Sequence, residues 1–382
     1  MNKGITADRY FSQTELKQKI TILTVCIQKH FKYIHHQCEL LERFNIDAEW
    51  EMIIVDNSTT GPSDFVLSDP RCKVVCGVPL DHTRPDNIRG SYHHAAALNR
   101  YVKEVKTRFL LILDPDLFII YWNWVNSSIG HMVRNDLCFF GTPWHPRWYS
   151  KYRYYPAVHF LLIDLQKVDV SCLDFMPAIV ERPAIGDRLL AREQSESLKL
   201  TKEQETNPEA VIKPRRFFWN ALRYIYRRTP LVFSRHRILS SRDTGWKLWA
   251  EFGSTGNFRG DIVLPVVDLS SELTKPKHLQ SRWGIRLERL LPLRWSFLPA
   301  YGSYVRRKRA HGFELPEFAS LKPECFIWRG SPFAFHLRRH VRDMVEMSSN
   351  ACDEDVMLDR LFAKMSNARC WFAWAEEPSE KT

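Results

Sequence analysis

The sequence predicts an α/β fold with a mostly parallel sheet and helices on both of its faces. Strand-like and helix-like segments alternate from Ile20 onward, which is typical of a doubly wound sheet. The run Phe109–Leu113 is short, apolar and β-rich, as in a strand buried on both faces. It ends in Asp114-Pro-Asp116, and such open sheets bind ligands outside the carboxyl ends of their strands. A ligand site is therefore expected at this edge.

Five elements are expected before the strand that carries the two aspartates. We expect strands over Ile20–Ile27, Trp50–Val55 and Cys72–Cys76, and helices over Tyr33–Phe44 and Ser91–Lys106. Because the carboxyl ends of parallel strands meet at one edge, Lys29, Asp56 and the aspartate pair should cluster there. Two carboxylates facing a phosphate-bearing ligand suit Mg²⁺ or Mn²⁺. If Asp114 and Asp116 are considered without the other residues, the alternative to a metal site is a simple turn after a strand.

Composition narrows the class of protein. A chain of 382 residues can bury a substantial core in one large domain or two. The net charge of +11 predicts an anionic partner, which could be nucleic acid, an anionic membrane surface or a nucleotide-sugar. Nine cysteines without metal-finger spacing are typical of reduced thiols in the cytoplasm. Residues 1–19 are polar, and no uncharged apolar run reaches the roughly 18–20 residues that span a bilayer, so we expect neither a secretory signal nor a membrane span.

The order of these motifs resembles the nucleotide-binding half of GT-A glycosyltransferases, close to the inverting enzymes of family 2. The resemblance lies in Thr24–Lys29, Ile54–Ser58, Gly90–Arg100 and the Asp-X-Asp motif Asp114-Pro-Asp116. It implies a Rossmann-like GT-A domain in which Asp56 recognises the nucleoside. It also implies that Asp114 and Asp116 hold Mn²⁺ or Mg²⁺ against the diphosphate of a nucleoside diphosphate sugar. Gln28-Lys29 and His93-His94 depart from the family pattern, so the resemblance does not specify the nucleotide.

Further residues are candidates for the donor side. Lys29 is a candidate phosphate contact, with a solvated loop lysine as the alternative. His93 and His94 are candidates for contact with metal or phosphate, although a histidine pair at a helix start is commonly solvated or hydrogen-bonded. Asn99 occupies the position of the asparagine in the matching helix of the family.

The next part of the chain is predicted to form the acceptor side. We expect a helix over Trp122–Arg134, strands over Leu137–Phe140 and Val158–Leu165, and between the strands an aromatic stretch from Trp144 to Tyr155. The aromatic rings suit the C–H faces of a sugar, or else they pack in the core. The resemblance places the last of these strands beside the acceptor, which makes Asp164 a secondary candidate for the chemistry.

Asp243 is the first candidate for the catalytic base. The segment Asp243-Thr-Gly-Trp246 matches the place where family 2 enzymes carry this base at the start of a helix, with Arg242 in place of the usual acidic neighbour. As a purely structural residue, Asp243 would instead cap that helix by accepting hydrogen bonds from its first amides.

Two basic tracts flank Asp243. Residues 186–213 are rich in polar residues and predict a flexible insertion. The following segment, 214–228, has an apolar face that includes Phe217, Phe218 and Leu222, with arginines around the rest. It predicts a helix lying on an anionic membrane or, alternatively, a helix packed on the protein. A second basic and aromatic tract covers 282–309.

The end of the chain is again core-like. The segments Cys325–Trp328 and Phe333–Leu337 are predicted to be buried, and Asp353–Met365 is predicted to be a helix with acidic residues at its start and Lys364 near its end. Some GT-A enzymes complete the metal site with a late histidine. His336 fits this place, with His340 as a weaker choice and a structural role as the alternative.

These observations predict a GT-A-like α/β enzyme with basic helical insertions. Residues 15–145 would form the nucleotide-sugar half, 146–260 the acceptor half with the insertion 186–235, and 261–382 would complete the domain. We expect metal-dependent, inverting transfer of a sugar to a hydroxyl of a glycan or lipid-linked acceptor. The setting expected is bacterial surface polysaccharide synthesis, by a cytoplasmic protein peripheral to the inner face of the plasma membrane.

Two alternatives remain from the residues themselves. A nucleotidyltransferase that forms nucleotide-sugars shares this kind of sheet, but the chain has no Gly-rich N-terminal loop followed by Arg and Pro-Lys. A basic protein that binds nucleic acid or membrane without catalysis would explain the charge. The basic residues lie in segments with bulky aliphatic faces and without zinc-finger or RNP-type motifs, so no specific nucleic-acid partner is expected.

Overall fold

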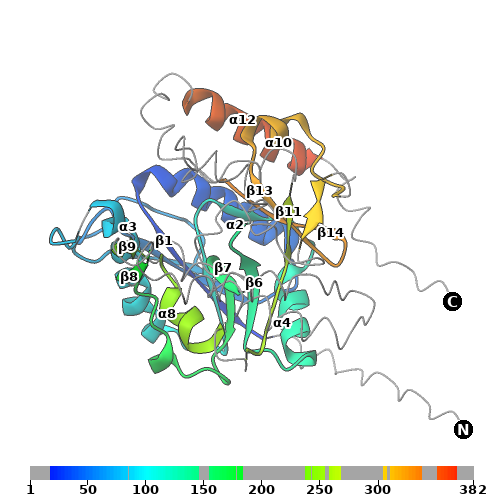
Figure 1. Ribbon diagram of the computed structural model, residues 1–382. Helices are drawn as coiled ribbons and strands as arrows, with labels where there is room; N and C mark the ends of the chain where they lie inside the picture. Colours follow the sequence, from blue (N-terminus) through cyan, green and yellow to red (C-terminus); the bar gives the residue numbers. More distant parts are fainter. Residues whose placement is uncertain are drawn as a thin grey trace, which may run out of the picture.

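The structure is a computed structural model that describes residues 18–84, 86–145, 155–177, 179–183, 237–241, 243–253, 258–267, 304–307, 310–337 and 351–367. These residues form the predicted α/β fold, with a seven-stranded sheet in the order β10-β6-β7-β4-β1-β2-β3 (Figure 1). A five-stranded sheet, in the order β12-β11-β13-β14-β5, and a two-stranded sheet of β8 and β9 accompany it.

The first half of the large sheet is parallel, as predicted. It consists of β1 (Ile20–Cys26), β2 (Trp50–Asp56), β3 (Cys72–Cys76) and β4 (Phe109–Leu113). Cys26 pairs with Asp56 at one end of the strands, and Ile20 pairs with Phe109 at the other. The carboxyl ends of these strands therefore share one edge of the sheet.

Helices cover both faces of these strands. The 3₁₀ turn η1 (Gln28–His30) leads into α2 (Phe31–Phe44), whose side chains pack with Ile20, Ile22 and Leu111. On the opposite face, α3 (Asp86–Tyr101), which continues into the 3₁₀ turn η2 (Val102–Glu104), packs with Leu23 and Leu110. Alternate strand residues thus serve two separate cores, as the two-residue period of a strand requires.

The second half of the large sheet contains one reversed strand. After α4 (Trp124–Arg134) and β6 (Phe139–Pro143), the chain forms β7 (Pro156–Asp164), which runs antiparallel between β4 and β6. The edge strand β10 (Gly260–Ile262) is parallel to β6. The reversal carries the end of β7 to the edge opposite the carboxyl ends of β1, β2 and β4.

The five-stranded sheet joins late segments to the middle of the chain. It contains β5 (Leu117–Ile119), β11 (Leu264–Val267), β12 (Val305–Arg306), β13 (Glu324–Trp328) and β14 (Ser331–His336). Because β5 begins directly after Asp116 and pairs antiparallel with β14, His336 lies opposite Leu117. The two C-terminal segments that were predicted to be buried form a hairpin that pairs with β5.

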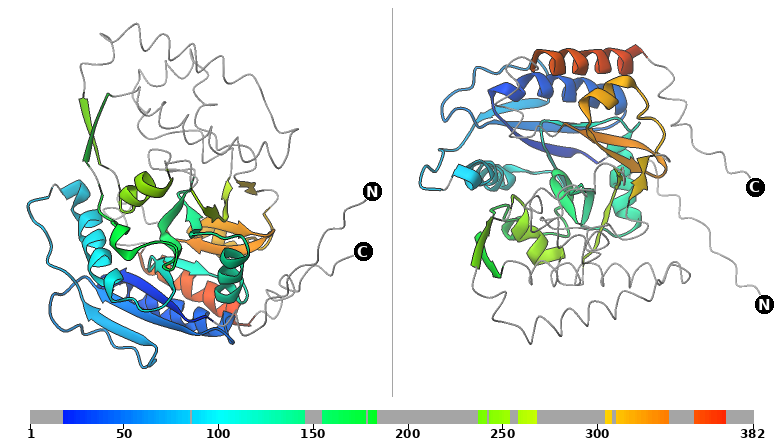
Figure 2. Two further views of the ribbon diagram at one scale, coloured as in Figure 1. Left: turned by 90° about the horizontal axis from the view of Figure 1, so that it is seen from below. Right: turned by 45° about the horizontal axis from the view of Figure 1, so that its top comes forward.

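The remaining helices and strands are short, except for α12. They are η4 (Val170–Cys172), β8 (Ile179–Pro183), β9 (Arg237–Ser241), α8 (Trp246–Leu248), the π-turn η6 (Trp249–Gly253) and α10 (Pro316–Leu321). The predicted C-terminal helix is α12 (Ala351–Asn367), which lies alongside α2 (Figure 2). There Lys32 pairs with Asp359 at 2.8 Å, and His36 stacks on Phe362.

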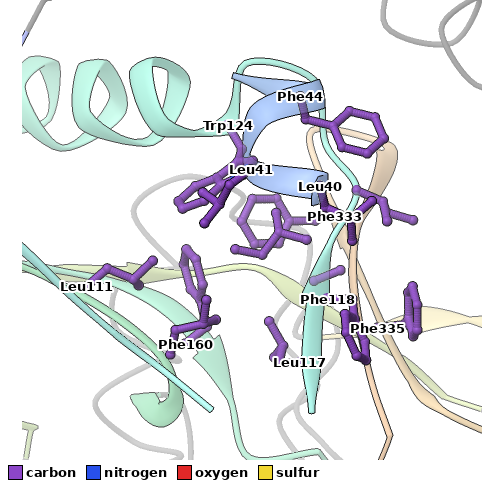
Figure 3. Close-up of a cluster of buried hydrophobic side chains, with 14 of the residues drawn as sticks. Leu40, Leu41, Phe44, Leu111, Leu117, Phe118, Trp124, Phe160, Phe333 and Phe335 are labelled. Atoms are coloured by element: carbon purple, nitrogen blue, oxygen red, sulfur yellow. The ribbon is translucent and has the colours of Figure 1, made fainter. Parts of the chain in front are cut away.

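Aromatic side chains pack the core between the five-stranded sheet and helix α2 (Figure 3). Phe118 of β5 is fully buried, and its ring contacts the rings of Tyr33, Phe335 and Phe362. These partners come from α2, β14 and α12, so one side chain connects three elements that are distant in the sequence.

Several predictions fall outside the described residues. They concern the insertion at 186–235, His340, the aromatic stretch between 146 and 154, and the second basic tract apart from 304–307. No helix among the described residues combines the length and the apolarity needed to cross a membrane.

We expect Phe118→Ala to lower the free energy of unfolding by about 3–5 kcal/mol, because it removes a fully buried ring and leaves a cavity. Chemical denaturation measures this loss. Val66 is 76% exposed, so Val66→Ala serves as the control, with an expected change within about 0.5 kcal/mol. Equal effects of the two substitutions would contradict the packing described at Phe118.

Candidate functional site

The two aspartates lie in a tight turn between β4 and β5. The amide of Leu117 donates to the carbonyl of Asp114 at 3.2 Å, which closes a four-residue turn with Pro115 in its second position, where proline is favoured. The amide of Asp114 donates to the carbonyl of His159 on β7, and the amide of Leu337 donates to the carbonyl of Asp116. Both aspartate side chains are about a quarter exposed, at 23% and 25%. Their carboxylates therefore stand at the surface of a turn whose backbone is held by both neighbouring strands.

His336 faces this turn from the end of β14. Its Nε2 lies 3.0 Å from Oδ1 of Asp116, and its Nδ1 lies 3.2 Å from Oε2 of Glu324. The histidine side chain is 4% exposed and that of Glu324 is 1% exposed, so the imidazole is enclosed between two carboxylates.

An irregular strand register brings Glu324 to His336. The β13–β14 hairpin turns at Arg329 and Gly330, both with positive φ, and Trp328 pairs with Ser331. If this register continued without interruption, Glu324 would lie opposite Phe335. The register shifts between Phe326 and Ile327, so Glu324 instead pairs with His336. The shift places a carboxylate and an imidazole on the same face of the hairpin.

The two carboxylates favour the charged form of His336. Burial alone would lower the pKa of the imidazole, but the charge and hydrogen bond of Asp116, together with those of Glu324, outweigh burial and raise the pKa to about 10. In the metal-free protein at neutral pH, the imidazole therefore carries a proton on both nitrogens.

Asp114, Asp116 and His336 can hold a divalent metal. One donor atom from each residue lies within 4.8 Å of the other two. Two carboxylate oxygens and an imidazole nitrogen suit Mn²⁺, and the carboxylates also suit Mg²⁺. A metal at Nε2 would replace one proton of His336, while Nδ1–H would still donate to Glu324. This is the usual carboxylate–histidine–metal arrangement, in which the outer carboxylate orients the imidazole.

Helix α3 connects these aspartates to Asp243. His94 Nε2 lies 3.7 Å from Asp114 Oδ1. Ser91, three residues earlier and so on the same side of the helix, donates from Oγ to Oδ1 of Asp243 at 2.8 Å. Thr244 returns a hydrogen bond from its Oγ1 to the carbonyl of Ser91. Two residues on the same side of α3 therefore contact the two aspartates: His94 contacts Asp114, and Ser91 contacts Asp243.

Asp243 does not cap α8, which corrects the alternative drawn from the sequence. The N-cap residue of α8 is Gly245, and no side chain caps the helix. The Asp243 carboxylate instead accepts from Ser91 Oγ and from its neighbour's amide, Thr244 N, at 2.9 Å. Its contacts thus fix the side chain relative to α3 rather than to α8.

Two of the donor-side candidates lie at the same edge as the aspartate turn. Lys29 is exposed in η1, just beyond the end of β1. Asp56 ends β2 and is 2% exposed, and its carboxylate accepts hydrogen bonds from Ser58 and Ser63. The parallel register of β1, β2 and β4 explains why these residues share one edge.

Two further donor-side candidates, His93 and Asn99, have local structural partners. His93 Nε2 forms a hydrogen bond with the carbonyl of Val78 at 2.7 Å, as in the alternative considered for the histidine pair. Asn99 donates to Asp174 Oδ1 and accepts from the amide of Phe175. The carbonyl of Phe175 in turn accepts from the amide of Gly245, so Asn99 supports the segment next to Asp243 rather than the end of β4.

Asp164 is at the wrong edge of the sheet for the acceptor role predicted from the sequence. It pairs with Phe109 at the start of β4, because β7 runs antiparallel to β4. Its carboxylate is fully buried and accepts two hydrogen bonds from the Arg108 guanidinium, at 3.0 and 2.9 Å. Asp164 therefore stabilises the opposite edge and does not join the aspartate turn.

Glu324, Ser91 and Gln37 contact the site and were not among the residues predicted from the sequence. Gln37 donates from its side-chain amide to the carbonyls of Asp114 and Leu117, both at 2.8 Å. A glutamine inside the apolar stripe of a helix, and a glutamate at the start of an apolar strand, were the available signals. Ser91 carried no comparable signal.

Comparisons with known proteins give partial structural likenesses. No protein-family model matches the chain, and no curated protein sequence matches it. Among solved structures, the galactosyltransferase LgtC with donor and acceptor sugar analogs is 16% identical, with a TM-score of 0.30 over 40% of this chain and 61% of that one. The mannosyltransferase PcManGT from Pyrobaculum calidifontis, in complex with GDP-Man and Mn²⁺, is 12% identical, with a TM-score of 0.28 over 40% of this chain and 47% of that one.

TarS from S. aureus is 17% identical, with a TM-score of 0.25 over 33% of this chain and 21% of that one. The chain thus spans less than two thirds of the length of each of these proteins. Because the sequence identities and TM-scores are this low, the likeness assigns neither a family nor an activity to the chain.

We expect His336 in the metal-free protein to titrate near pH 10 by NMR, against about 6.5 in the unfolded chain. Because the folded pKa is the higher one, the stability that this proton contributes is fully present below pH 6.5 and is lost as the pH rises to 10. Glu324→Gln should lower the pKa of His336, and its cost in unfolding free energy should be larger at pH 6 than at pH 9.

The exposed pair of His311 and Glu314 provides the control for this titration. We expect Glu314→Gln to change the free energy of unfolding by no more than about 0.5 kcal/mol, because both side chains are exposed. A normal pKa for His336 would contradict the two-carboxylate environment.

Proposed function

We propose that this protein is a metal-dependent glycosyltransferase that moves a sugar from a nucleoside diphosphate donor to a hydroxyl group. The observation that carries the proposal is the group of Asp114, Asp116 and His336 at the carboxyl ends of the parallel strands β1, β2 and β4. Two carboxylates, an imidazole and a nearby lysine suit a metal together with a diphosphate.

Different residues of the chain would bind different parts of the donor. Asp114, Asp116 and His336 would hold Mn²⁺ or Mg²⁺, which when bound neutralises charge on the diphosphate leaving group. Lys29, exposed at the same edge, would contact a phosphate. His94, 3.7 Å from Asp114, would contact the same diphosphate. Asp56 would recognise the nucleoside from the end of β2.

Asp243 would act as the general base. As the acceptor oxygen attacks the anomeric carbon, the bond from that carbon to the diphosphate oxygen breaks and the hydroxyl proton passes to Asp243. A single displacement of this kind inverts the anomeric centre and needs no covalent enzyme intermediate. The hydrogen bonds from Ser91 and Thr244 support this role by holding the carboxylate in place.

The proposed acceptor is a glycan or a lipid-linked sugar at the inner face of a bacterial plasma membrane, in surface polysaccharide synthesis. The net charge of +11 supports attraction to an anionic membrane or lipid-linked acceptor. We therefore propose a cytoplasmic protein that associates peripherally with the membrane.

The aspartate pair tests the metal-dependent step. We expect UDP, GDP or dTDP to raise the melting temperature only with Mn²⁺ present, since a bound ligand stabilises according to its concentration relative to Kd. Asp114→Asn or Asp116→Asn should abolish this shift, because the amide is nearly isosteric but neutral. The exposed Asp47 provides the control substitution, Asp47→Asn, which should retain it. Wild-type shifts in both site variants would overturn the proposed metal centre.

Asp243→Asn tests the base. The amide oxygen of asparagine can still accept from Ser91 and Thr244, so the fold and donor affinity should be preserved. Turnover should fall about 10²–10⁴-fold, which is the usual contribution of a positioned base. Glu251→Gln, at an exposed carboxylate eight residues further along the chain, is the matched control for charge loss in this region. Full activity of Asp243→Asn would remove the base role.

A further inference from the structure

Gln37 is a polar residue on the buried face of α2. The buried residues of this helix are otherwise mostly apolar: Tyr33, Ile34, Gln37, Cys38, Leu40, Leu41 and Phe44. Gln37 is only 3% exposed. A polar side chain is costly to bury unless it forms hydrogen bonds, so its partners indicate why it occupies this position.

Both donors of the Gln37 amide contact one turn. Nε2 donates to the carbonyl of Asp114 and to the carbonyl of Leu117, each at 2.8 Å. These are the first and last residues of the turn that carries Asp114 and Asp116. A side-chain amide has two N–H donors, and here they bridge the two ends of the turn.

Gln37 holds the turn from a different side than the strands do. The amide of Asp114 is tied to β7 through His159, and the carbonyl of Asp116 is tied to β14 through Leu337. Gln37 adds a contact from the helix layer. Because α2 begins directly after η1, the same helix connects the turn to the exposed Lys29.

We propose that Gln37 is a positioning residue of the metal centre. By fixing the ends of the turn, it presents the Asp114 and Asp116 carboxylates to His336 at a spacing that one divalent metal can bridge. The inference rests on the proposed function, and it adds a residue that acts on the metal through the backbone of the turn.

The test measures Mn²⁺ affinity without donor, using the EPR signal of free Mn²⁺. Gln37→Met keeps the length of the side chain and removes both N–H donors. We expect a 10–100-fold weaker Mn²⁺ affinity, the range found for outer partners of metal ligands. At saturating Mn²⁺, kcat should recover while the apparent KM for Mn²⁺ remains raised, because the ligands are intact but less well arranged.

Asn45 provides the matched control on the same helix region. It is 2% exposed, donates to Leu41 O and accepts from the amide of Val125, so Asn45→Ala removes comparable buried hydrogen bonds away from the turn. It should lower the melting temperature while leaving Mn²⁺ affinity unchanged. Gln37→Asn is the milder second variant, since it keeps the amide on a shorter side chain that cannot bridge both carbonyls, and it should also weaken Mn²⁺ binding.

The outcomes separate the two proposals. Wild-type protein that binds no Mn²⁺ would overturn the metal centre and this inference with it. Binding by the wild type, with unchanged affinity in Gln37→Met, would overturn the positioning role alone. The positioning role would also be overturned if Asn45→Ala lowered the melting temperature as much as Gln37→Met and weakened Mn²⁺ binding as much. It would be overturned as well if both Gln37 variants failed to fold, since Gln37 would then serve stability only.

Discussion

The site depends on a buried charge interaction in which His336 lies between Asp116 and Glu324. A carboxylate as buried as that of Glu324 is costly unless it is paired, and an enclosed imidazolium is equally so. Each group therefore requires the other, and together they fix the end of β14 against the aspartate turn. The pairing of β14 with β5 ends at the same contact, because His336 lies opposite Leu117.

Two helices on opposite faces of the large sheet organise the residues around this contact. From one face, α2 reaches the turn through Gln37. From the other, α3 presents His94 to Asp114 and Ser91 to Asp243. A third residue of α3, Asn99, accepts a hydrogen bond from the amide of Phe175, whose carbonyl accepts from the amide of Gly245 near Asp243. The proposed metal ligands and the proposed base are thus held by regular elements rather than by loops alone, which favours well-defined geometry.

Much of this arrangement could be predicted from the sequence because it depends on local patterns. Apolar runs with polar endings identify the parallel strands, and parallel strands necessarily bring Lys29, Asp56 and the aspartate turn to one edge. The placement of Asp164 failed because an apolar run such as Val158–Leu165 has no direction, and β7 is reversed. Glu324 was missed because a shift of one residue in the hairpin register decides which side chain faces His336. The capping role of Asp243 failed because α8 starts beyond Gly245.

The sequence separation of the proposed metal ligands has a consequence for synthesis. Asp116 and His336 are 220 residues apart, and they meet only when β14 pairs with β5. During translation the two carboxylates emerge long before the imidazole, and two carboxylates from one turn form a weaker chelate than the complete set. The third donor arrives only with the late hairpin, so the complete donor set can assemble only after synthesis has passed His336.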